Sequence, residues 1–103
     1  MAEYRFEREC RTPHSEAYLI VTGDERAGRV DLHFTPSIAY ATLCISGKMS
    51  SEEIQDLIDQ IDEELVISAD IARDDFIVTV YQGQEVGIYS DEEFGEEELE
   101  EEP

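Results

Sequence analysis

The chain has 103 residues, of which 41% are hydrophobic and 33% are charged, and its formal net charge is −20 at pH 7. This length fits one small domain, and so negative a chain is not expected to bind nucleic acid or anionic membranes directly. There is no run of 18 apolar residues, so no membrane span is expected, and the first residues lack the apolar region of a secretion signal. A cytoplasmic location is therefore expected.

The charge is unevenly distributed along the chain. Residues 1–48 contain seven acidic and six basic residues, whereas residues 49–103 contain twenty acidic residues and only Arg73 as a base. Residues 91–103 include nine acids, and such a segment cannot bury enough apolar surface to order itself. The sequence therefore predicts a single domain over residues 1–90, followed by a disordered acidic tail over residues 91–103.

The first predicted strand covers residues 3–10 and alternates with a period of two. Tyr4, Phe6 and Cys10 share one face, as a half-buried strand requires. Arg8 falls on this apolar side, and an inward or edge-lying charge is typical of an edge strand. This strand could therefore supply an edge for self-association into a homo-oligomer.

Three more strands are predicted before the middle of the chain. Residues 17–22 form a continuous apolar run, which is typical of a central strand covered on both faces. Residues 29–35 alternate again, and residues 38–45 are rich in β-branched and aromatic side chains. The glycine-flanked segment 23–28 predicts a hairpin between the first two of these strands.

A helix is predicted from Ser50 to Leu65. Ser50 and Glu53 match a capping box, with Ser51 as the alternative cap. Five aliphatic residues recur at helical spacing and form a stripe that must face the core. They are Ile54, Leu57, Ile58, Ile61 and Leu65.

The remaining elements complete an α+β fold. Residues 76–81 predict a strong strand, residues 82–85 a turn, and residues 86–89 a short return strand. The order is then β-β-β-β-α-β-β, and the expected architecture has two layers, an antiparallel-rich sheet with one amphipathic helix packed on one face.

The outer face of the predicted helix is acidic and contains no basic residue. The candidate partner-binding residues on it are Glu52, Asp56, Asp59, Asp62 and Glu63. Like charges at these spacings weaken a helix, so their presence calls for a reason other than helix stability. The leading hypothesis is a small non-enzymatic interaction module that binds a basic partner protein through the helix face and the tail.

Three other interpretations of the acidity stay open. The charge could be an adaptation to high salt, in which repulsion is screened. The chain could be a DNA mimic that inhibits a nucleic-acid-binding protein, although the required spacing of acids is not visible in a sequence. It could also be an enzyme of unknown type, for which exposed carboxylates with ordinary pKa values are poor general acids.

No metal or other cofactor is expected. Cys10, His14, His33 and Cys44 are the only set of residue types suited to zinc, but zinc modules normally present their cysteines as a close pair. The simpler interpretation is that both cysteines are buried as small hydrophobic residues and both histidines lie on the surface. No serine has the flanking glycines of a nucleophile elbow, so no catalytic residue is assigned.

Overall fold

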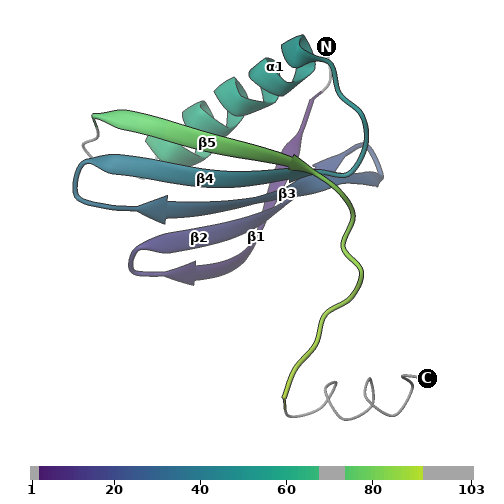
Figure 1. Ribbon diagram of the computed structural model, residues 1–103, viewed down its shortest axis with the longest axis horizontal. Helices are drawn as coiled ribbons and strands as arrows, with labels where there is room; N and C mark the ends of the chain where they lie inside the picture. Colours follow the sequence, from purple (N-terminus) through teal and green to yellow (C-terminus); the bar gives the residue numbers. More distant parts are fainter. Residues whose placement is uncertain (1–2, 68–73, 92–103) are drawn as a thin grey trace.

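The computed structural model describes residues 3–67 and 74–91. Its elements are β1 (Arg5–Thr12), β2 (Ser15–Thr22), β3 (Glu25–Phe34), β4 (Ile38–Ile45), α1 (Ser51–Ile61), a π-helical turn η1 (Asp62–Val66) and β5 (Asp75–Gln82). The strands form one sheet in the order β1-β2-β3-β4-β5, and α1 lies across one face of it (Figure 1). The predicted two-layer α+β fold is confirmed.

The sheet combines an antiparallel meander with one parallel strand. Strands β1 to β4 pair in antiparallel hairpins, because short turns join them directly. The chain then crosses over through α1, so β5 returns parallel to β4 and becomes an edge of the sheet. The helix covers one face only, and the other face is called the open face below.

The predicted return strand over residues 86–89 is wrong. Residues 83–90 have no helix or strand, and they run away from the sheet without turning back along β5 (Figure 1). Gly83 N donates to Ile45 O at 2.9 Å, so the chain stays beside the end of β4 at the point where the turn was expected. The predicted tail lies almost entirely outside the described residues.

The helix begins as predicted, with Ser50 as its N-cap. Glu53 N donates to Ser50 Oγ at 3.1 Å and Ser50 N donates to Glu53 Oε1 at 2.8 Å, which completes the capping box. After Ile61 the helix widens into η1, and this wider turn places both Leu65 and Val66 in the core. The sequence pattern predicted Leu65 but placed Val66 in the following connection.

The core lies between α1 and the centre of the sheet. Its fully buried side chains come from both layers, because paired positions on β2, β3 and β4 direct apolar residues to the helix side. The largest are Ile20, Leu32, Leu43, Leu57, Ile61, Val30 and Val66. Strand β2 lies inside the sheet, and it has buried side chains on both faces, since Ala17 and Val21 are buried on the open face although no second layer covers it.

A β-bulge in β1 changes the face on which Cys10 lies. The register with β2 shifts between Arg8 and Cys10, so Arg8 lies opposite Tyr18 whereas Cys10 lies opposite Ala17 on the open face. The expectation that Cys10 is buried is therefore wrong, because the inserted residue Glu9 interrupts the alternation. Cys44 on β4 is half-buried rather than buried.

Within the two described ranges, no helix is long and apolar enough to cross a membrane.

Candidate functional site

The predicted partner-binding residues all lie on α1 and η1, but they are not equally accessible. Glu52, Asp59 and Glu63 are exposed, whereas Asp56 and Asp62 are half-buried. The capping box and the buried stripe fix the rotation of the helix, and they direct the exposed acids away from the sheet. The accessible part of the acidic face therefore consists of Glu52, Asp59 and Glu63.

The ion pairs of the described residues are concentrated on the sheet and its connections. They join Arg5 to Glu7, Arg11 to Glu16, Arg26 to Glu85, and Arg29 to both Glu9 and Asp31. In the described part of the chain, none of them includes Glu52, Asp59 or Glu63. The arginines thus compensate acids of the sheet layer and leave the negative charge on the exposed helix face.

The negative potential of the helix also reaches the start of the chain. Tyr4 O accepts a hydrogen bond from Gln60 Nε2 at 2.9 Å, which ties the residue before β1 to α1. Burial, followed by the nearby carboxylates of Glu53 and Asp56, raises the pKa of Tyr4 above its usual value. Burial and the neighbouring carboxylates therefore both disfavour the charged form of this phenol.

A compact ionic cluster occupies the centre of the open face. Arg29 Nη1 donates to Glu9 Oε1 at 2.8 Å, and Arg29 Nη2 donates to Asp31 Oδ1 at 3.3 Å. Burial alone would lower the pKa of Arg29, but the hydrogen bonds and charges of Asp31 and Glu9 outweigh burial and raise it. The cluster is internally neutralised and links β1 to β3, so we assign it a structural role.

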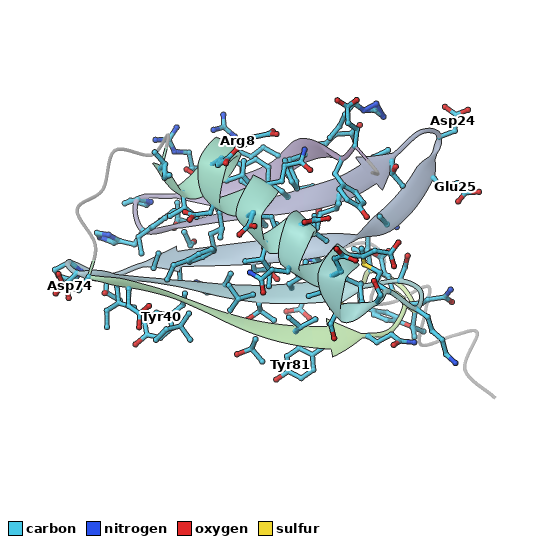
Figure 2. The ribbon with its side chains drawn as sticks, turned by 90° about the horizontal axis from the view of Figure 1, so that it is seen from above. Arg8, Asp24, Glu25, Tyr40, Asp74 and Tyr81 are labelled. Carbon is cyan, nitrogen blue, oxygen red and sulfur yellow. The ribbon has the colours of Figure 1, made fainter. Side chains whose placement is uncertain are left out.

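An apolar patch on the open face was not found from the sequence. Tyr40 and Ile77 are direct neighbours across β4 and β5. Tyr81 lies two rows further along the same face, beyond the paired Thr42 and Thr79. All three are exposed, and Figure 2 shows Tyr40 and Tyr81 beside β5, toward the opposite edge of the sheet from Arg8. The strand pattern of residues 76–81 carried the relevant signal, because a strand covered on one face only leaves every second apolar residue in contact with solvent.

The cysteines and histidines do not gather into one site. Cys10 lies on β1 and Cys44 on β4, so two strands separate them. At about 4.8 Å per strand, this is about 14 Å, well beyond the reach of a disulfide. His33 lies on β3 opposite Ser15, and His14 lies in the turn before β2. Among the described residues, no three His, Cys, Asp or Glu side chains are placed to hold a metal ion.

Comparison of the chain with protein-family models, with curated proteins and with solved structures gave no match.

Proposed function

We propose that this protein acts in the cytoplasm as a non-enzymatic interaction module that binds a basic protein surface through the acidic face of α1 and η1. The observation that carries the proposal is the distribution of ion pairs. Arginines of the sheet layer pair with acids of the same layer or of the chain just after it, while Glu52, Asp59 and Glu63 have no such pairing within the described residues. A partner rich in Lys and Arg would supply the missing positive charge.

The position of the acids along the helix supports a role in binding. Asp62, Glu63 and Glu64 lie where the helical segment ends, and no basic residue lies in its last turn. Negative charge at this end opposes the helix dipole, so these residues reduce the stability of the helix instead of increasing it. Glu63 is also exposed, and an exposed charge that weakens the helix is better explained by recognition of a partner than by stability.

The partner-binding test replaces exposed acids only. In an affinity capture from cell lysate, we expect the triple variant Glu52→Lys, Asp59→Lys and Glu63→Lys to lose the basic proteins that the unchanged chain retains. These three positions are exposed, so the variant should keep its fold, which circular dichroism checks. Each retained protein is then purified and titrated separately against the unchanged chain and against the triple variant, since direct binding is the decisive measurement.

A matched control separates the helix face from total charge. The variant Glu100→Lys, Glu101→Lys and Glu102→Lys makes the same change in net charge within the tail sequence. Equal loss of binding in both variants would mean that overall charge, or the tail, governs recognition. Unchanged binding of a purified partner by the helix variant would reject the helix face as the contact surface.

Unfolding of the unchanged chain at different salt concentrations tests the alternative of adaptation to high salt. A chain adapted to salt should lose its cooperative fold as salt is removed, because repulsion among its acids is no longer screened. The proposed interaction module should instead unfold cooperatively at low salt, as followed by circular dichroism during heating. Loss of the fold at low salt would favour salt adaptation over the proposed function.

A further inference from the structure

We infer that the chain forms a symmetric dimer in which residues 84–89 of each copy pair with the outer edge of β5 in the other copy. The inference goes beyond the proposed function, because it concerns contact with a second copy of this chain and uses the β5 edge and the segment after it instead of the acidic helix face. Four features carry it, namely the edge strand, the segment after it that has no strand partner, the route of the chain between them, and the symmetry of the exchange.

The outer edge of β5 is open and lacks protection. Within residues 3–67 and 74–91, β4 is the only strand that pairs with β5. Edge strands are normally blunted by charges, prolines or bulges. Strand β1, at the other edge, has two of these protections, because it contains five charged residues and a bulge. Strand β5 contains a single charged residue, Asp75, at its first position.

The side chains of β5 are exposed on both faces of the sheet. Ile77 (40% exposed) and Tyr81 (58%) lie on the open face, and Val80 (36%) lies on the helix side opposite Leu43. In an interior strand these positions would be covered by residues of the next strand. The missing neighbour is thus a strand with apolar side chains on both faces.

The segment after β5 has the composition of such a strand. Val86 is 94% exposed and Ile88 is 69% exposed, and residues spaced by two share one face of a strand. Tyr89 would then occupy the opposite face. This segment has no strand partner of its own within the described residues.

The chain is directed away from its own β5 edge. Gly83 N donates to Ile45 O, on the β4 side, and Glu85 forms an ion pair with Arg26 at 3.6 Å, at the start of β3. A two-residue hairpin through Gly83 and Gln84 would need positive φ at Gly83. Gly23 has this conformation (φ 62°) in the β2–β3 hairpin, but Gly83 does not.

Exchange between two copies satisfies both unpartnered elements at once. Each copy donates its segment and accepts the segment of its partner, so a two-fold axis closes the assembly at two copies. A foreign strand on β5 would cover the edge but leave Val86 and Ile88 in solvent. For this reason the second copy, and not another protein, is the occupant that the chain itself specifies.

The test uses the full chain in moderately high salt, where repulsion between acidic copies is screened. Sedimentation equilibrium over a range of protein concentrations should show a dimer. The double variant Val86→Asp and Ile88→Asp should be monomeric at every concentration at which the unchanged chain dimerises. Neither side chain is buried in the single copy, so the fold should be unaffected. The control Ser51→Asp and Gln55→Asp adds the same charge at exposed positions of α1 and should dimerise normally.

Hydrogen exchange separates this arrangement from its competitors. The amides of β5 that face outward should be protected in the dimer and should lose protection in the Val86→Asp, Ile88→Asp variant. A monomer with protected outward amides would show that the segment folds back on its own β5, and a monomer with unprotected ones would show an open edge. A dimer that persists in the variant would place the interface elsewhere, for example at β1. Each of these three results would overturn the inference.

Discussion

Gly28 lies at a close approach between strands β3 and β4. A Cβ atom built at this position would collide with the carbonyl oxygen of Cys44 on the neighbouring strand β4. Gly28 lies opposite Ile20 on one side and Ile45 on the other, and a bulge in β3 immediately precedes it. Because Gly28 has no side chain, β3 and β4 can stay paired at this position, which is the last pair of their register.

The substitution Gly28→Ala should therefore destabilise the protein. Because the obstacle is backbone and cannot rotate away, we expect a loss of about 1–3 kcal/mol in the free energy of unfolding, as for other overpacked sites. Urea unfolding followed by circular dichroism measures the change. Gly47→Ala is the control, since a Cβ there meets nothing within 4 Å, and it should change stability by no more than about 0.5 kcal/mol. Equal effects of the two substitutions would show that the close approach is unimportant.

Single residues also mark the limit of prediction from alternation. The pattern of residues 3–10 placed Tyr4 and Phe6 correctly, and both pack against the core. It failed for Cys10, because the bulge at Glu9 reverses the faces beyond it. A bulge follows from pairing with a neighbouring strand, so the residues of one strand alone carry no sign of it.

Among the elements, α1 was the easiest to predict because its signals are local. The capping box and the apolar stripe need only residues within a few positions of one another, and both are present as expected. The widening at η1 was not predicted, since its benefit is the burial of Val66 against the sheet, a tertiary contact.

The structure also decides between the two possible caps, and this can be measured. Ser50→Ala should reduce the free energy of unfolding by about 1 kcal/mol, because Glu53 N loses its acceptor. Ser51→Ala is the matched control, since Ser51 is the first helical residue and lies outside the box, and it should have little effect. Thermal unfolding of both variants provides the comparison. A larger loss of stability for Ser51→Ala than for Ser50→Ala would show that Ser51, and not Ser50, caps the helix.

The strand that failed to appear shows where local pattern is insufficient. Residues 86–89 have the apolar side chains of a strand, yet a strand exists only if its backbone finds a partner. Whether that partner is its own β5 depends on the turn at Gly83, and Gly83 lacks the positive φ that a two-residue hairpin would need there. The apolar pattern was thus recognised correctly and its pairing was not.

For the molecule as a whole, the exposed acids of the helix and the apolar patch of Tyr40, Ile77 and Tyr81 lie on different faces of the sheet. The acidic residues of α1 and η1 cover the helix layer, whereas Tyr40, Ile77 and Tyr81 lie on the open face beside β5. The division of charge between the two halves of the sequence was visible from composition. The separation of the acidic surface from the apolar patch was not visible from composition, because this separation depends on which face of the sheet the helix covers.

The two proposed contacts should respond to salt in opposite directions. Binding of a basic partner to the helix face should weaken as salt rises, because attraction between opposite charges is screened. Dimerisation through residues 84–89 should strengthen, because the two copies carry like charge and their repulsion is screened. Titration calorimetry with the partner and sedimentation of the chain alone, each at low and high salt, measure the two trends. If partner binding and dimerisation both strengthened or both weakened with salt, one of the two contacts would not be of the proposed kind.

The parallel pairing of β5 has a consequence for how the chain folds. Strands β1 to β4 pair with their neighbours in the chain, so each hairpin closes only a short loop. Strand β5 instead adds to β4 across the whole of α1, a long-range contact that is slow to form. We therefore expect the near-neutral half of the chain to form the meander first and β5, from the acidic half, to join it last. Until β5 docks, β4 is itself an edge, and the nascent chain is most prone to aggregate in that interval.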